Sequence, residues 1–140
     1  MQVSRLLAAL LLTSATQAFA ADPSYLLVDH SNASLMDKTT AQEVWASKGP
    51  AKFYKFYPVK KWGFATDVEG GFDADKNCII TARTTMLPRG VKVDTLVLRP
   101  AKSATTFGVQ ANATVEQCKA LAKAKLSDSM DAVRTALLHD

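Results

Sequence analysis

The sequence predicts a single α+β domain: a four- or five-stranded antiparallel meander sheet, a short N-terminal helix, and a long C-terminal amphipathic helix packed on one face. Apolar and polar residues alternate over 62–72, which is the pattern of a half-buried strand. Over 115–137 apolar residues recur every three or four positions, as in an amphipathic helix. Of two cysteines, Cys78 lies shortly after the first region and Cys118 lies within the second.

The first twenty residues have the pattern of a secretory signal peptide. Arg5 precedes an apolar run over 6–12, and the segment ends with the small residues Ala18 and Ala20. This run is shorter than the roughly 20 residues that a bilayer-spanning helix needs. We therefore expect cleavage after Ala20 and a mature domain of residues 21–140 that is periplasmic or secreted, with no stable membrane anchor.

The charge of the mature domain does not indicate nucleic acid as a partner. Loss of 20 residues from 140 leaves 120, the size of one domain. Loss of Arg5 leaves 16 basic residues against 13 acidic ones. So mild an excess does not indicate nucleic-acid binding. Composition does not fix the oligomeric state.

The elements of the N-terminal half follow from local patterns. Residues 25–30 are a short apolar run that predicts a first strand. Thr40 and Glu43 have the spacing of a capping box, so we expect a short helix over 41–48. Gly49-Pro50 then ends it.

The central region predicts four strands joined by short turns, which favours antiparallel neighbours. The expected strands cover 62–72, 78–87, 94–99 and 105–111. The acidic turn that starts at Asp73 has the spacing of the first ligands of a calcium loop, but the Gly and Glu that such a loop needs further along are missing. We expect a polar turn there, and neither a metal nor another cofactor.

The C-terminal helix has a capping box of its own, Thr114 with Gln117. We expect one helix, with a possible kink or break near Ser127. Its apolar stripe contains Val115, Cys118, Ala122, Leu126, Met130, Val133 and Leu137.

Cys78 and Cys118 are an even pair in a chain expected to be exported, which predicts a disulfide. Two buried free thiols are the alternative. Cys78 shares a strand face with Ile80, and Cys118 lies in the helical stripe. A bond between them requires the helix to lie across that face of the sheet, with Cα atoms within about 7 Å.

An aromatic and basic segment before the sheet is the candidate partner-binding surface, because exposed rings between cations suit stacking and cation–π contacts. The alternative is an edge strand that buries Phe53 with Phe56 or Tyr57 and uses its lysines against aggregation. The candidate residues are Lys52, Tyr54, Lys55, Tyr57, Lys60, Lys61 and Trp62.

The sequence contains no recognisable catalytic motif around its histidines, His30 and His139. The leading expectation is therefore a binding protein, not an enzyme, that acts by occlusion, such as an inhibitor or immunity protein against an envelope hydrolase or toxin. One alternative is a secreted enzyme whose site is assembled from distant residues. Another is a carrier of a small apolar ligand in a cavity between sheet and helix, lined by Phe64, Val68, Ile80, Val97, Phe107 and Met130.

Overall fold

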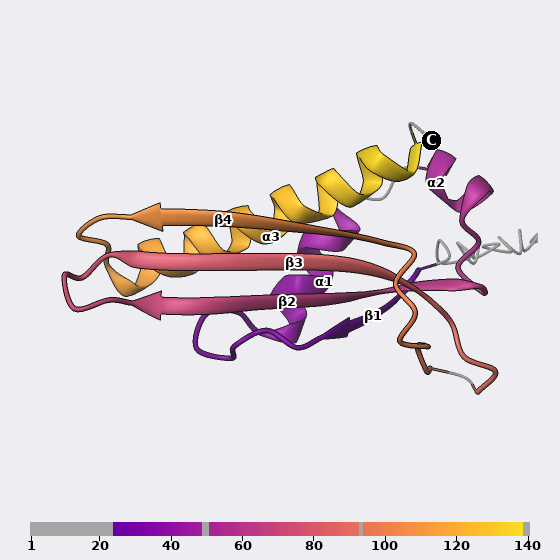
Figure 1. The fold of residues 1–140 in the computed structure, drawn as a ribbon, viewed down its shortest axis with the longest axis horizontal. Coiled ribbons are helices and arrows are strands. Elements are labelled where there is room, and N and C mark those ends of the chain that lie inside the picture. The colour runs from indigo at the N-terminus through magenta and orange to yellow at the C-terminus, as the bar shows by residue number, and fades with distance from the viewer. Residues whose placement is uncertain (1–23, 49–50, 93, 139–140) are drawn as a thin grey trace, which may run out of the picture.

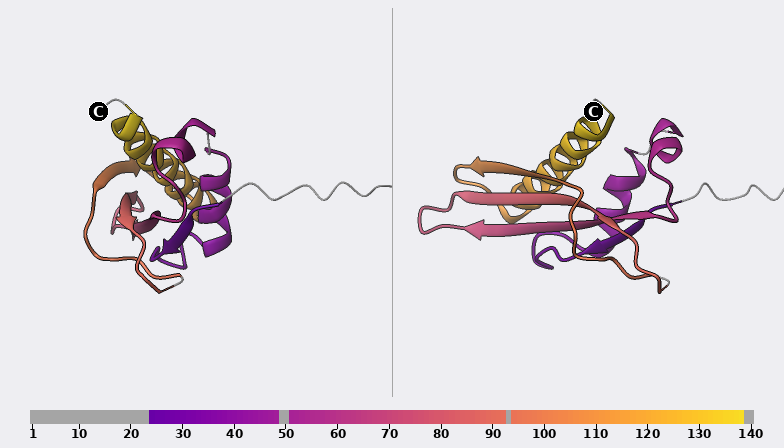
Figure 2. Two further views of the ribbon diagram at one scale, coloured as in Figure 1. Left: turned by 90° about the vertical axis from the view of Figure 1, so that its right-hand side faces the viewer. Right: turned by 45° about the vertical axis from the view of Figure 1, so that its right-hand side comes forward.

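A four-stranded sheet in the order β1-β2-β3-β4 carries the helices α1 and α3 on one face (Figures 1 and 2). The structure is a computed structural model that describes residues 24–48, 51–92 and 94–138, without the side chains of 51–53. This arrangement confirms the α+β class and the long C-terminal helix packed on the sheet. The elements are β1 (Leu26–Asp29), α1 (Lys38–Ala46), α2 (Ala51–Phe56), β2 (Trp62–Phe72), β3 (Cys78–Pro88), β4 (Lys102–Gln110) and α3 (Val115–Leu138).

The β2–β3 hairpin is the centre of the sheet, and its alternation confirms the expected pattern. Trp62 lies opposite Pro88 and Phe72 opposite Cys78. The turn between the strands is the polar one expected, because the Asp73 carboxylate accepts a hydrogen bond from the Asn77 backbone N–H at 2.8 Å. The residues of the hairpin that are buried against the helices are Phe64, Thr66, Val68, Cys78, Ile80, Ala82, Thr84 and Met86.

Strand β1 corrects the prediction of a purely antiparallel sheet. It runs parallel to β2, with Leu26 opposite Gly63 and Asp29 opposite Thr66. Parallel neighbours need a long crossover connection, and the segment that contains α1 and α2 supplies it. The apolar run of β1 predicts a strand but contains nothing that fixes its direction, which is why the sequence pattern missed the mixed sheet.

The strand expected over 94–99 is not formed. Leu96 makes only an isolated bridge with Arg89, and the Val97 N–H donates to the Pro88 carbonyl at 2.9 Å. Asp94 has a φ of 63°, which interrupts extended backbone. The segment is therefore a loop folded back on the end of β3, and β4 starts at Lys102, before the expected residue 105.

Helix α1 begins one turn before the predicted position. The Asp37 carboxylate is the N-cap and accepts a hydrogen bond from the Thr40 N–H at 2.6 Å. Thr40, the predicted cap, lies inside the helix. Asp37 and Thr40 are both of residue types that cap helices, and Asp is the more strongly preferred N-cap of the two.

Helix α3 is one uninterrupted helix whose predicted capping box is confirmed. The Thr114 N–H donates to Gln117 Oε1 at 2.8 Å, and the Gln117 N–H donates to Thr114 Oγ1 at 3.2 Å. The predicted stripe is buried except for Val115, whose exposed fraction is 56% because the helix has only just begun there. Ser129 lies in the buried stripe and was not predicted.

The predicted disulfide is present and joins the first residue of β3 to the first turn of α3. The Cα atoms of Cys78 and Cys118 are 5.5 Å apart, and both residues are buried. The bond holds α3 across the face of the sheet that the sequence pattern indicated.

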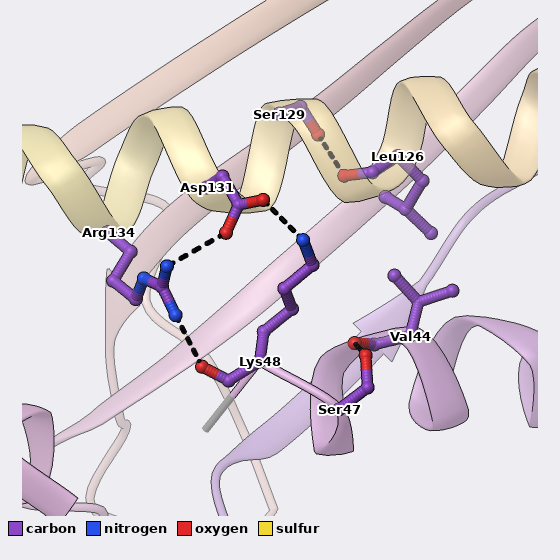
Figure 3. A network of polar contacts seen from close by, with 7 residues as sticks. All are labelled: Val44, Ser47, Lys48, Leu126, Ser129, Asp131 and Arg134. Atoms are coloured by element: carbon purple, nitrogen blue, oxygen red, sulfur yellow. Dashed lines mark hydrogen bonds and ion pairs between the residues drawn. The ribbon is translucent and has the colours of Figure 1, made fainter. Parts of the chain in front are cut away.

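A charged network fixes the end of α1 to α3 (Figure 3). Asp131 on α3 forms an ion pair with Lys48, and Arg134 lies 3.1 Å from the same carboxylate. Arg134 also donates to the Lys48 carbonyl at 2.7 Å. All three side chains are only partly exposed. The network holds the end of α1 against α3.

Candidate functional site

A cleft of about 1170 Å³ lies along β1, where α1 and the start of the β3–β4 loop approach it. The whole of β1 lines it, and α1 contributes one face of its helix. Tyr54, Arg89 and Asp94 complete the wall. The residues of α1 in this wall are Lys38, Gln42, Trp45 and Ala46.

The cleft has an aromatic wall that is packed in place. Tyr25 and Tyr54 stack with ring centroids 5.2 Å apart, and Trp45 packs against the buried Phe64 at 4.1 Å. The Tyr25 hydroxyl donates to the Tyr57 carbonyl. Burial raises the pKa of the Tyr25 hydroxyl above its ordinary value, so this donor stays protonated. Rings held in this way present a preorganised apolar surface.

Polar groups of both charges surround this apolar wall. Arg89 donates to the Val59 carbonyl at 3.1 Å and lies 3.5 Å from the Asp94 carboxylate. The Asp29 carboxylate accepts from the Thr66 hydroxyl at 2.8 Å. Lys38 is exposed on α1. A rim of this kind matches a partner that carries both polar and apolar groups.

Strand β1 stands at one edge of the sheet, because β2 is its only strand neighbour in the order β1-β2-β3-β4 of the described residues. An edge strand offers backbone N–H and C=O groups to an added strand. The cleft follows β1 from Leu26 to Asp29. It therefore combines a strand edge with an aromatic wall, and this pair of features recurs in sites that bind extended peptides.

The structure divides the predicted aromatic and basic surface instead of presenting it as one patch. Residues 51–56 form α2, so the alternative of an edge strand is wrong. Tyr54 lines the cleft. The Tyr57 hydroxyl donates to the Leu137 carbonyl at 2.9 Å, and its ring contacts Trp62, so these two rings serve packing.

The described cations of that segment do not share the cleft with Tyr54. Lys55, Lys60 and Lys61 are exposed and do not line the cleft. Phe56, expected to be buried in the edge-strand alternative, has an exposed fraction of 65%. The Lys52 side chain lies outside the described residues.

The apolar cavity proposed for a small ligand is not formed by the residues named for it. Phe64, Val68, Ile80 and Met130 are core residues packed between sheet and helix. The other two, Val97 and Phe107, have exposed fractions of 47% and 63%. They cannot line a cavity with the first four.

The histidines and the expected cleavage residues are the other candidates that the sequence suggested. His30 is exposed and does not line the cleft, whereas His139 and the expected cleavage residues Ala18 and Ala20 lie outside the described residues. Over residues 24–48, 51–92 and 94–138, no cluster of three His, Cys, Asp or Glu side chains could hold a metal ion. No helix in the same ranges has the length and apolar character to cross a membrane.

Sequence reasoning missed most of the cleft. Four of its residues on α1 were not among the site candidates that the sequence indicated: Lys38, Gln42, Trp45 and Ala46. Once the helix is known to start at Lys38, these residues recur at helical spacing and form a second face of α1. Comparison with family models, with curated proteins and with solved structures finds no match to this chain.

Proposed function

We propose that this is an exported binding protein that holds an extended segment of another protein in the β1–α1 cleft and occludes the function of that partner. An envelope hydrolase or a toxin is the class of partner that we propose. The observation that carries the proposal is the cleft itself, in which the edge of β1 lies beside the rings of Trp45 and Tyr54. Such a protein needs a rigid surface and no catalytic residue.

The mode of binding that we propose is strand addition. The incoming segment pairs its backbone with the outer edge of β1, which supplies affinity without dependence on sequence. Its alternate side chains lie against Trp45 and Tyr54, since aromatic residues are the usual anchors of protein interfaces. Lys38 and Gln42 on α1 then meet its polar groups and set specificity.

Two observations support a protein partner over a small apolar ligand. The cleft is open along β1 and bordered by charged groups, whereas small-ligand sites enclose most of their ligand. The residues suggested for an apolar cavity are packed in the core or exposed elsewhere. A polypeptide satisfies both the apolar wall and the polar rim.

A matched pair of variants on α1 tests the proposal. Gln42 lines the cleft, whereas Thr39 is exposed on the same helix and does not line it. Tagged wild type, Gln42→Arg and Thr39→Arg would each be used to capture proteins from an extract of the exported fraction. We expect wild type and Thr39→Arg to retain the same stoichiometric partner and Gln42→Arg to lose it.

The proposal fails if no stoichiometric partner is retained across several growth conditions, or if Gln42→Arg retains it as well as Thr39→Arg does. A native mass that includes a small bound molecule would support the carrier alternative instead. Equal melting temperatures of the two variants would show that the comparison reports binding and not folding.

A further inference from the structure

The loop between β3 and β4 presents apolar side chains to solvent. Val91 is fully exposed, and the exposed fractions of Leu98 and Val97 are 91% and 47%. Lys92 and Arg99 are exposed beside them. We name these five residues the loop tip. Val91 and Lys92 lie in the turn that the hydrogen bond from Gly90 to Thr95 closes, and Val97 is bonded to Pro88 at the end of β3. Exposed apolar side chains on one loop are typical of contact with a protein or a membrane.

The backbone next to the loop tip is held by the rest of the fold. The Arg89 N–H donates to the Lys61 carbonyl at 2.8 Å, and the Gly90 N–H donates to the Thr95 carbonyl at 2.8 Å. The Leu96 side chain lies over Gly63 of β2. Inward residues of the loop thus pack on the sheet while the loop tip faces solvent, so its exposure is a feature of the fold.

Charge is distributed unequally along the molecule. Residues 54–62 and 88–102 contain seven basic residues and one acidic residue, Asp94, which is paired with Arg89. Figure 1 places α2 and the β3–β4 loop at the same end of the long axis, opposite the acidic β2–β3 turn. The loop tip therefore lies at a cationic end of the protein.

We infer that the loop tip docks on the surface of an anionic phospholipid bilayer, with Leu98 and Val91 entering the headgroup region. Apolar residues beside cations combine the two contributions that bind proteins to such surfaces: buried apolar area and attraction to anionic lipid. The loop projects from the body of the fold (Figure 2), and a projecting loop can enter a lipid surface without a shaped partner. The inference uses other residues than the cleft, so either can fail alone.

Vesicle sedimentation tests the inference with a matched pair of variants. Leu98→Asp removes an apolar side chain and adds a negative charge at the loop tip. Val115→Asp makes the same kind of change at the start of α3, where the side chain is also exposed and an acid suits the helix N-terminus. The vesicles are phosphatidylcholine alone or phosphatidylcholine mixed with phosphatidylglycerol, at low and at high salt.

We expect wild type and Val115→Asp to sediment with the phosphatidylglycerol vesicles at low salt and not with phosphatidylcholine alone. Leu98→Asp should bind clearly more weakly. The double variant Lys92→Glu with Arg99→Glu should lower the apparent affinity by roughly tenfold or more, and salt should weaken wild-type binding. Circular dichroism would establish that every variant is folded.

The inference is overturned if wild type ignores the anionic vesicles at low salt, or if Leu98→Asp and Val115→Asp bind them equally. It is also overturned if Leu98→Asp loses a captured protein while wild type shows no lipid binding, because the loop tip is then a protein contact.

Discussion

The hydroxyl of Thr84 on β3 lies 2.7 Å from the hydroxyl of Ser129 on α3, and both residues are fully buried. Ser129 also donates to the Leu126 carbonyl of its own helix at 2.9 Å, so Thr84 is the donor to Ser129. A polar contact thus joins helix and sheet inside their buried interface.

Because of this contact, Ser129→Ala should lower the free energy of unfolding by about 1–3 kcal/mol, since it leaves the Thr84 hydroxyl buried without its acceptor. Adding Thr84→Val should recover part of the loss, because the orphaned hydroxyl is removed. Urea denaturation of wild type, both single variants and the double variant measures the coupling. Strictly additive losses would mean that the two hydroxyls do not interact.

Removal of the disulfide should destabilise the protein by about 4 kcal/mol in the chain-entropy model, given the 40-residue separation of its cysteines. Cys78→Ala and Cys118→Ala should have similar effects, and the double variant should be no worse than either, because all three lose the same bond. Chemical denaturation under non-reducing conditions gives the comparison. Additive losses would contradict a shared bond.

The buried stripe of α3 predicts that substitutions on its two faces will differ in their effect on stability. Met130→Ala should cost about 2–5 kcal/mol, because it leaves a cavity between helix and sheet, and Val133→Ala should also be clearly destabilising. Lys123, exposed on the other face, should change stability by no more than about 0.5 kcal/mol when replaced by Ala. Thermal and urea unfolding would both test this. Similar effects at all three positions would rule out the assigned face.

The lowered pKa values of two aspartates predict how the stability of the fold depends on pH. Side-chain and backbone hydrogen bonds from Asn77 lower the pKa of Asp73 below its ordinary value of 3.8, and the Thr40 amide does the same to the pKa of Asp37. A lowered pKa in the folded state adds stability that is present above 3.8 and lost as pH falls through the lower, folded value.

Asp73→Asn should therefore reduce the loss of stability on acidification, measured by urea denaturation from neutral pH to below 3.8. Asp75→Asn, which removes a charge from the same turn, is the matched control. An identical acid profile for wild type and Asp73→Asn would contradict the assigned hydrogen bonds.

Much of the fold could be predicted because local patterns determine it. The alternation of β2 and β3, the Thr114 cap and the stripe of α3 each depend on neighbouring residues, and the Cys78–Cys118 bond then fixed how helix and sheet meet. The direction of β1 depends on a crossover that no local pattern encodes. The run over 94–99 is apolar like a strand, yet Asp94 turns the backbone and the side chain of Leu98 faces solvent.

The site was harder to predict than the fold because it is assembled from distant segments. Tyr25, Trp45 and Tyr54 meet only through the parallel placement of β1 and the packing of α1. The aromatic and basic segment contributed Tyr54, while Tyr57 and Trp62 proved to be packing residues. The sequence shows where aromatic residues are concentrated, but the packing of distant segments determines which of them line the cleft.

Site-specific photo-crosslinking in living cells tests the central proposal most directly. A photoreactive amino acid would replace Gln42 inside the cleft or, as the control, Thr39 outside it on the same helix. We predict a single adduct of defined mass from position 42, with the crosslink in an extended segment of one exported protein, and none from position 39. No adduct at position 42, or the same adducts at both positions, would contradict a partner bound along β1.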